Sequence, residues 1–330
     1  MKTLYIIGNG FDLFHNLKTK YQHFALFLLK KNPDLFALMV KYYWLTDLDP
    51  DDEATSLRDE LWGDFENKLS EMDLEELLDD FTNYLPDYGS DEFRSGDYHT
   101  FDQEISRMID RLTTELYAVF KEFILQVEFD ESPSGLIALE PNSLYLSFNY
   151  TDTLELYYGI ERKQITYIHG RALTDGEATI LGHGIDPEEF MDKPPVAPTG
   201  LSEEELQQWT DEQSDQYDYA YNTGRDTATG YFRISHKSTA ELIEKHSQFF
   251  SSLKDVQKVF VLGHSISPVD QPYFLEVIKS VDPGTEWKVS YYGGSEMAER
   301  METMVHLGVT EAHLEMITID NLKVRQKELF

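Results

Sequence analysis

The chain has 330 residues, which is enough to bury a large core as one elaborated α/β domain or as a domain carrying a big insertion. It contains no cysteine, so disulfide bonds and thiolate metal sites are excluded. With 61 acidic and 28 basic residues, the net charge of -33 argues against direct binding to nucleic acid or to an anionic membrane, because such binding depends on Lys and Arg.

The location and the charge distribution follow from simple patterns. The apolar run after Met1-Lys2-Thr3 is too short for a signal-peptide core, and no run approaches transmembrane length, so we expect a cytoplasmic protein. Acidic residues are concentrated between Asp47 and Glu92 and between Glu188 and Asp218. We interpret both stretches as solvated surface, although a docking surface for a partner would have the same composition.

The first predicted element is a buried strand, Leu4–Ile7, which ends in the glycine turn Gly8-Asn9-Gly10-Phe11-Asp12. A strand that passes through such a turn into a helix leaves backbone N–H groups that can hold a phosphate. The turn lacks the full G-x-G-x-x-G fingerprint, and a plain turn uses glycine in the same way. We interpret Asp12 as a helix cap or a ribose contact, because a carboxylate beside a phosphate is repulsive.

A large helical insertion is predicted next, over residues 32–139. Apolar residues recur at three- and four-residue spacing from Trp62 to Phe81, and a long helix is predicted from Thr100 through Phe123. Residues 1–31 and 140–330 then form a Rossmann-like nucleotide-binding core, with an acidic insertion at 186–245. An insertion of this length is far above the usual connection between strands.

Strands alternate with helices after the insertion, which predicts an α/β fold with a mostly parallel sheet and helices on both faces. The predicted strands are Leu144–Phe148, Gln164–Ile168, Thr179–Leu181, Lys258–Leu262, Trp287–Tyr291 and His313–Ile319. The predicted helices are Thr151–Tyr158, Ser202–Trp209, Thr239–Leu253, Val269–Ser280 and Ser295–Leu307.

Polar residues follow three of these strands as well as the first. They are Asn149 with Asp152, His169, and the turn Gly263-His264-Ser265. Since the carboxyl ends of parallel strands meet at one crevice, we expect these segments and the first glycine turn to form a single site. Asn149 could equally cap the helix that starts near Thr151, and His169 could be a turn histidine.

Two further groups of residues could take part. Arg233, His236 and Lys237 form a small basic cluster that could neutralise a substrate phosphate, although ordinary surface charges have the same pattern. His183 and His264 could bind a metal together with an aspartate, but their spacing fits no known ligand pattern, and no metal is assigned.

Five segments together resemble the bacteriophage abortive infection family AbiH, in order and in rough spacing. They are Ile6–Leu13, Trp62–Glu66, Phe148–Glu155, Ile168–Gly170 and Leu262–Ile266. One departure is Asn16-Leu17-Lys18, where such proteins more often have Gly-Leu-Pro. The resemblance implies a role in bacterial defence against phage, and it implies no known reaction.

The same motifs are similar in order to the NAD-binding core of sirtuins and sirtuin-like NAD hydrolases. This resemblance implies catalytic roles for Asn149, Asp152 and His169, and a nucleotide held by the two glycine turns, Gly8 to Asp12 and Gly263 to Ser265. Asn149 and Asp152 are three positions apart, whereas sirtuins have Asn-x-Asp. The cysteine-bound zinc module cannot exist here, which favours hydrolysis of NAD over protein deacetylation.

We therefore expect an anti-phage effector that binds NAD or a related nucleotide and hydrolyses it at the N-glycosidic bond. We expect no prosthetic group. A non-catalytic nucleotide-binding sensor that recognises a phage component is one alternative, and a nuclease-type effector is another. The expected partners are a nucleotide and a phage-derived trigger or partner protein, with no direct contact to nucleic acid or membrane. The sequence leaves open whether the chain forms a homo-oligomer.

Overall fold

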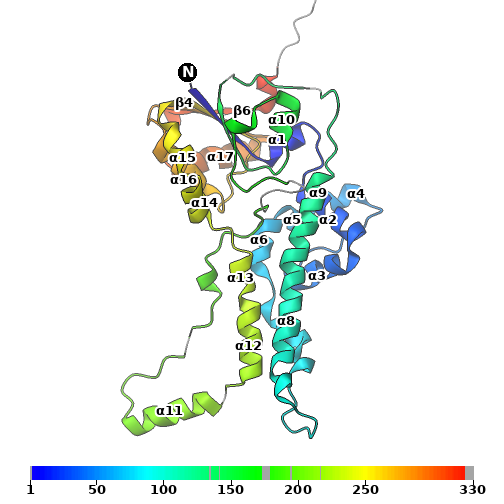
Figure 1. The fold of residues 1–330 in the computed structure, drawn as a ribbon. Coiled ribbons are helices and arrows are strands. Elements are labelled where there is room, and N and C mark those ends of the chain that lie inside the picture. The colour runs from blue at the N-terminus through cyan, green and yellow to red at the C-terminus, as the bar shows by residue number, and fades with distance from the viewer. Residues whose placement is uncertain are drawn as a thin grey trace, which may run out of the picture.

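The fold places a parallel sheet beside a large group of helices (Figure 1). The computed structural model describes residues 2–133, 135–140, 142–172, 179–193, 195–215 and 217–323. The six strands are paired in parallel in the order β3-β2-β1-β4-β5-β6, which confirms the predicted Rossmann-like α/β class. Their bounds are β1 Lys2–Ile7, β2 Leu144–Ser147, β3 Ile165–Tyr167, β4 Val256–Leu262, β5 Glu286–Ser290 and β6 Leu314–Ile317.

The order of the strands reverses at β1. The last residue of β1, Ile7, lies opposite Ser147 of β2 on one side and Leu262 of β4 on the other. The chain leaves β1 toward β2 and β3, and later returns to add β4, β5 and β6 on the opposite side. In open α/β sheets, ligands bind outside the carboxyl ends of the strands at such a switch point.

Helices cover both faces of the sheet, as predicted. Leu4 and Ile6 of β1 point to one face, where they share a core with four helices. Those helices are α14 Thr239–Lys245, α15 Ser247–Ser251, α16 Gln271–Ser280 and α17 Gly294–His306. Tyr5 and Ile7 point to the other face, which is covered by two short helices, α1 Asn9–Phe14 and α10 Thr153–Tyr158. We call the sheet together with these six helices the sheet unit.

The other half, which we call the helical unit, has its own apolar core. It includes α2 Tyr21–Lys31, α3 Pro33–Tyr43, α4 Glu53–Ser56, α5 Glu60–Gly63, α6 Phe65–Lys68, α7 Leu74–Asp80, α8 Thr100–Asp110 and α9 Leu116–Leu125. A π-helical segment, Arg111–Glu115, joins α8 to α9, so the predicted long helix is present with one irregular turn. Fully buried aromatic side chains such as Phe24, Trp62 and Phe101 form the centre of this core.

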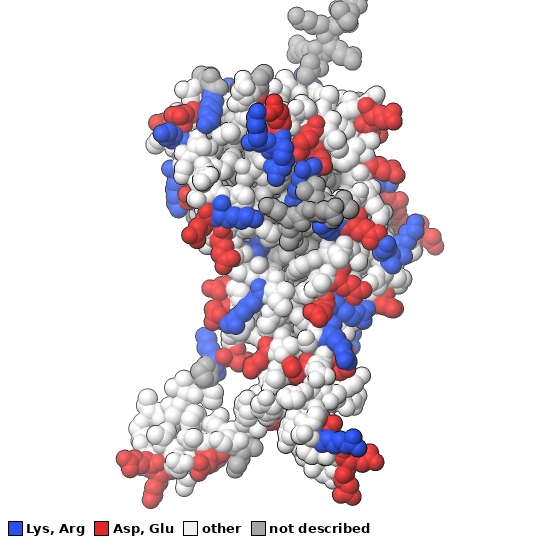
Figure 2. Space-filling view, viewed as in Figure 1, with Lys and Arg blue, Asp and Glu red and all other residues white. Residues whose placement is uncertain are grey.

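The predicted acidic insertion at 186–245 contributes further helices to the helical unit. Helices α12 Tyr219–Thr229 and α13 Tyr231–Ile234 bring Ala228, Tyr231 and Phe232 into the same core, and α12 runs beside α8 in Figure 1. Helix α11 Glu203–Asp215 stands apart from the body, with acidic side chains at its tip (Figures 1 and 2). Since α2 also packs in this core, the helical unit starts before the predicted boundary at residue 32.

The short strand predicted at Thr179–Leu181 is wrong, because these residues adopt no strand conformation. Within the described part of the chain, no helix combines the length and the apolar character needed to cross a membrane.

Candidate functional site

The glycine turn after β1 is packed tightly against the turn after β4. The N–H groups of Gly8 and Gly10 donate to the carbonyl oxygens of Leu262 and Gly263, at 3.0 and 2.7 Å, and the Phe11 N–H donates to the Gly8 oxygen at 2.9 Å. Gly263 has a φ of 67°, and a Cβ there would lie 2.1 Å from the Phe11 nitrogen, so only glycine fits.

This packing corrects the role predicted for the first glycine turn. Of the N–H groups in this turn that were expected to hold a phosphate, those of Gly8, Gly10 and Phe11 already have partners within the protein, and those of Gly8 and Gly10 join the turn to Leu262 and Gly263. Asn9 is exposed, and its side chain donates to the Thr19 carbonyl oxygen at 3.0 Å.

Asp12 is a structural link and contacts solvent over only 1% of its surface. Its two oxygens accept hydrogen bonds from the hydroxyls of Thr151 and Thr153, at 2.5 and 2.7 Å. Burial raises the pKa of Asp12 to about 6, although hydrogen bonds from Thr151, Thr153 and Asn149 oppose that rise. The predicted cap or ribose contact is therefore replaced by a tie between α1 and the start of α10.

Asn149 is fixed directly at the switch point. Its side-chain nitrogen donates to the Gly8 carbonyl oxygen at 3.1 Å, and its backbone N–H donates to Ser147 Oγ at 3.2 Å. The amide oxygen Oδ1 is buried and has no hydrogen-bond partner among the described residues. Asp152 occupies the N-cap position of α10, so the alternative that Asn149 caps this helix is wrong.

Two buried histidines flank the ring of Phe148, the residue that follows β2. The ring centroids of His169 and His264 lie 5.2 and 4.3 Å from that of Phe148, both edge-on. The structure therefore brings together the ends of β2, β3 and β4, as the sequence predicts for these segments.

Hydrogen bonds set the tautomers of both histidines. The N–H of Ile266 donates to His264 Nδ1 at 2.9 Å, which leaves the proton of a neutral ring on Nε2. Ile266 has a φ of 59°, a conformation that strains a β-branched residue, so the turn keeps this contact at a cost of about 1–3 kcal/mol. A ring N–H of His169 donates to the backbone of Phe148, which leaves the lone pair of the neutral ring on Nε2, and Nε2 has no hydrogen-bond partner within the described chain.

Asp270 faces both histidines from the turn that precedes α16. Its Oδ1 lies 3.7 Å from His169 Nε2, and its Oδ2 lies 3.6 Å from His264 Nε2. Lys237, from the segment between α13 and α14, lies with its ammonium 3.6 Å from the same Oδ1. In the described structure, this Oδ1 and the buried hydroxyl of Tyr273 lack hydrogen-bond partners.

Lys237 also connects this group to the helical unit. Its ammonium lies 2.6 Å from Glu66 Oε2, and the other oxygen of Glu66 accepts a hydrogen bond from the Tyr21 hydroxyl at 2.6 Å. We call His169, His264, Asp270, Lys237 and Glu66 the strand-end cluster. The cluster joins the carboxyl edge of the sheet to helix α6.

Burial and charge fix the protonation states of the cluster. Burial lowers the pKa of His264 to about 3, and burial together with the nearby Lys237 lowers the pKa of His169 well below its usual value. Burial alone would lower the pKa of Lys237, but the carboxylates of Glu66 and Asp270 raise it overall. At neutral pH the cluster therefore holds two neutral imidazoles beside a buried ammonium.

Asp152 and Ser265 occupy different surroundings from the cluster. Both oxygens of Asp152 pair with the guanidinium of Arg171, and hydrogen bonding to Asp152 raises the pKa of that arginine. Ser265 is exposed at the edge of the sheet, next to His264. The aspartate that faces His169 is Asp270, which the sequence reasoning did not select.

The sequence also did not predict the positions that Lys237 and Glu66 take in the structure. Lys237 was grouped with Arg233 as a small basic cluster, yet its side chain is fully buried while Arg233 is exposed and pairs with Glu188. Glu66 belongs to the Trp62–Glu66 segment, which contributed to the family resemblance but to which the sequence assigned no chemical role. The only feature of the sequence that could have pointed to Glu66 is that it is an acidic residue within the Trp62–Glu66 segment.

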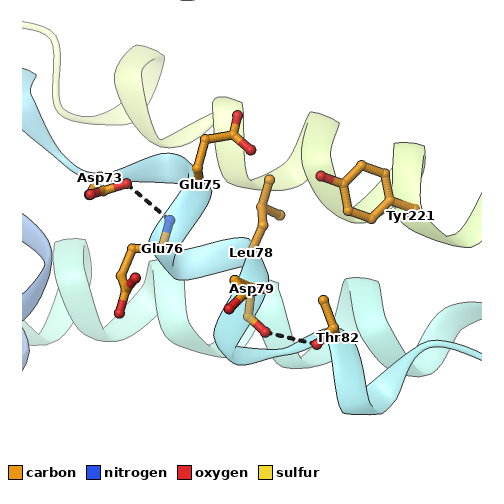
Figure 3. A pocket seen from close by; sticks show the side chains of 7 residues that line it. All are labelled: Asp73, Glu75, Glu76, Leu78, Asp79, Thr82 and Tyr221. Atoms are coloured by element: carbon orange, nitrogen blue, oxygen red, sulfur yellow. Dashed lines mark hydrogen bonds between the residues drawn. The ribbon is translucent and has the colours of Figure 1, made fainter.

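A separate acidic pocket of about 420 Å³ lies between α7 and α12 (Figure 3). It is lined by Asp73, Glu75, Glu76, Leu78, Asp79, Thr82 and Tyr221. Several of these carboxylates have roles within the protein: Asp73 caps α7, Glu75 pairs with Arg225, and Glu76 pairs with Lys41. The pocket belongs to the helical unit and shares no lining residue with the strand-end cluster.

The chain matches the model of a known protein family. A family model described as Bacteriophage abortive infection AbiH matches residues 4–291, which include most of β1, all of β2 to β5 and the whole strand-end cluster. No curated protein has a matching sequence.

Proposed function

The chain belongs to the bacteriophage abortive infection AbiH family, and we propose that it defends against phage by hydrolysing NAD or a related nucleotide at the N-glycosidic bond. One observation carries the proposal. His169 Nε2 is buried, has no hydrogen-bond partner among the described residues, and lies 3.7 Å from Asp270 Oδ1. A buried polar atom without a partner is costly, and a polar substrate or a bound water would supply that partner.

The position of the cluster supports a nucleotide as the substrate. It lies at the carboxyl ends of β2, β3 and β4, beside the strand at which the order reverses, where α/β sheets bind their ligands. The order of the motifs, similar to that of the NAD-binding core of sirtuins, makes NAD the first nucleotide to test.

In the proposed reaction, a water oxygen forms a bond to the C1′ carbon of the ribose while the bond from C1′ to the nicotinamide nitrogen breaks. The electron pair of that bond returns to the pyridinium ring, which leaves as neutral nicotinamide, and the water gives its proton to His169 Nε2. The lowered pKa of His169 keeps Nε2 unprotonated at neutral pH and below. Proton transfer of this kind contributes roughly 10²–10⁴-fold to a rate.

Asp270 and Asn149 have supporting roles in the proposed reaction. Asp270 stabilises the imidazolium formed on His169 and the positive charge that develops on the ribose. Asn149 is anchored to Gly8 through its nitrogen, which leaves its oxygen Oδ1 to orient the water or a ribose hydroxyl.

The test is to incubate the purified protein separately with NAD, ATP and RNA and to measure the products by chromatography. We expect nicotinamide and ADP-ribose from NAD. His169→Gln should reduce the release of nicotinamide by about 10²–10⁴-fold. His15→Gln is the matched control, because His15 is also buried but bonds to the Phe11 oxygen and the Tyr158 hydroxyl, outside the cluster.

The outcomes separate the function classes. Nicotinamide release that persists in His169→Gln would contradict the assigned role of this residue. Binding of NAD without its consumption would favour a nucleotide sensor that responds to a phage component, and cleavage of RNA would favour a nuclease.

A further inference from the structure

The strand-end cluster contains a buried cation that joins the two halves of the molecule. The Lys237 side chain has no exposed surface, and its ammonium lies 2.6 Å from Glu66 of α6 and 3.6 Å from Asp270 of the sheet unit. Glu66 is further held by the Tyr21 hydroxyl of α2, at 2.6 Å. One nitrogen therefore connects the helical unit to the carboxylate that faces His169.

Such an arrangement is expensive to build. Removing a charge from water costs several kcal/mol unless partners compensate for it, and buried ion pairs often contribute little net stability. Apolar residues at positions 66 and 237 together would avoid that cost. The ion pair is therefore better explained by the geometry that it fixes than by the stability that it adds.

The geometry around Asp270 Oδ1 identifies what is fixed. Lys237 Nζ lies 3.6 Å and His169 Nε2 lies 3.7 Å from this same oxygen. The ammonium draws the carboxylate toward one position, and it places a positive charge near the imidazole. Both effects act on His169 without any contact between Lys237 and the reacting atoms.

We infer that Lys237 is a positioning residue, which ties Glu66 of the helical unit to Asp270 and keeps the His169 imidazole neutral as a proton acceptor. The catalytic part of this inference rests on the proposed function. The electrostatic part concerns the protein alone, and it can be tested without a nucleotide.

Several charged or titratable groups face His169 from the surrounding elements. Asp270 comes from the turn before α16, His264 from the turn after β4, Lys237 from the segment before α14, and His246 from the start of α15. Lys237 and His264 oppose protonation of His169, as burial does. Removal of the ammonium should therefore raise the pKa of His169.

The experiment is an NMR titration of the histidine rings in the nucleotide-free full-length protein, with the His169 signal assigned from its loss in His169→Gln. Lys237→Met should raise the pKa of His169 by about 1 pH unit or more, because a nearby like charge is lost. Lys237→Arg keeps the charge and should leave the pKa of His169 within a few tenths of a unit. His313, on the exposed segment before β6, serves as an internal reference.

A second variant guards against loss of the fold. Lys237→Met leaves the Glu66 carboxylate without its cation, so the melting temperature should fall; Glu66→Gln combined with Lys237→Met removes both charges and should recover much of that loss. An unchanged pKa of His169 in a folded Lys237→Met variant would overturn the inference. Absence of nicotinamide release from the wild-type protein would contradict the proposed function and leave the titration result intact.

Discussion

Two buried aspartates at the same edge of the sheet have opposite surroundings. Asp12 follows β1, and each of its oxygens accepts a short hydrogen bond from a threonine hydroxyl. Asp270 follows β4, and its nearest cationic and imidazole neighbours stand 3.6–3.7 Å away, with Oδ1 lacking a hydrogen-bond partner in the described structure. A carboxylate whose bonds are complete holds the scaffold together, whereas one with incomplete bonds can still bind or stabilise a ligand.

The largest expected difference between Asp12 and Asp270 is in the effect of their substitution on the rate of NAD hydrolysis. Asp270→Asn keeps the shape of the side chain but removes the charge that faces His169, so we expect the rate of NAD hydrolysis to fall by about 10²–10⁴-fold. Steady-state measurement of nicotinamide release checks this.

Asp12→Asn is the matched substitution for that experiment. It also replaces a buried aspartate at the same edge of the sheet, and it should leave turnover per folded molecule close to that of the wild type. Equal losses of turnover in the two variants would contradict the distinction between a structural and a functional carboxylate.

The second effect is the pH dependence of stability that comes from Asp12. Burial raises its pKa from 3.8 to about 6 in the folded protein, so the folded state binds this proton more tightly than the unfolded state does. The stabilisation is therefore fully present below about pH 3.8 and is lost as the pH rises through about 6. A rise of this size corresponds to about 3 kcal/mol of unfolding free energy.

Urea denaturation at pH 4 and pH 7 measures this contribution. Many other carboxylates titrate in the same range, so the quantity of interest is the difference between the wild type and Asp12→Asn. We expect the free energy of unfolding of the wild type to fall between these pH values by about 2–2.5 kcal/mol more than that of the variant, because the unfolded state is already partly ionised at pH 4. A difference in the opposite direction would mean that Asp12 stays ionised in the folded state.

The sheet unit could be predicted from sequence more completely than the helical unit. Buried strands give short apolar runs, so the run predicted at Lys258–Leu262 corresponds to β4. Strand order could not be predicted, because β1, β2 and β4 each consist mainly of buried residues and no local pattern indicates which strands are neighbours. Helix α12 was missed because its Gly224 and its threonines are poor helix formers; it exists because it packs on α8, where a Cβ at position 224 would lie 2.3 Å from the Phe101 ring.

The candidate site also contains some residues that could be predicted from the sequence and others that could not. Asn149, His169 and His264 could be predicted because each lies two residues after the end of a strand, and parallel topology brings such positions to one edge. Lys237 could not, because its burial depends on Glu66, which lies 171 residues earlier in another unit. No local pattern separates it from its exposed neighbour Arg233.

A smaller effect is expected from the donors around Asp12. Thr153→Val removes one of its two hydroxyl partners at a buried position, and we expect a loss of about 1–2 kcal/mol in the free energy of unfolding. Thr113→Val is the control: that hydroxyl is equally buried but donates only to the Ile109 carbonyl of its own helix, so its loss should cost less. Urea denaturation of both variants at pH 7 gives the comparison, and equal losses would show that Thr153 has no special role at Asp12.

The smallest effect concerns a hydroxyl that donates to Asp270. Ser267 Oγ donates to Oδ2 at 3.2 Å, a long bond that orients the carboxylate without neutralising it. Its loss in Ser267→Ala is worth about 0.5–1 kcal/mol, which corresponds to a reduction of about 2–5-fold in kcat/KM for NAD. Ser202→Ala removes a hydroxyl-to-carboxylate bond of the same three-residue spacing, to Glu205 on α11, and should leave kcat/KM unchanged. If Ser267→Ala instead matched the loss in Asp270→Asn, the hydroxyl itself would have to act on the substrate, and Asp270 would serve to position it.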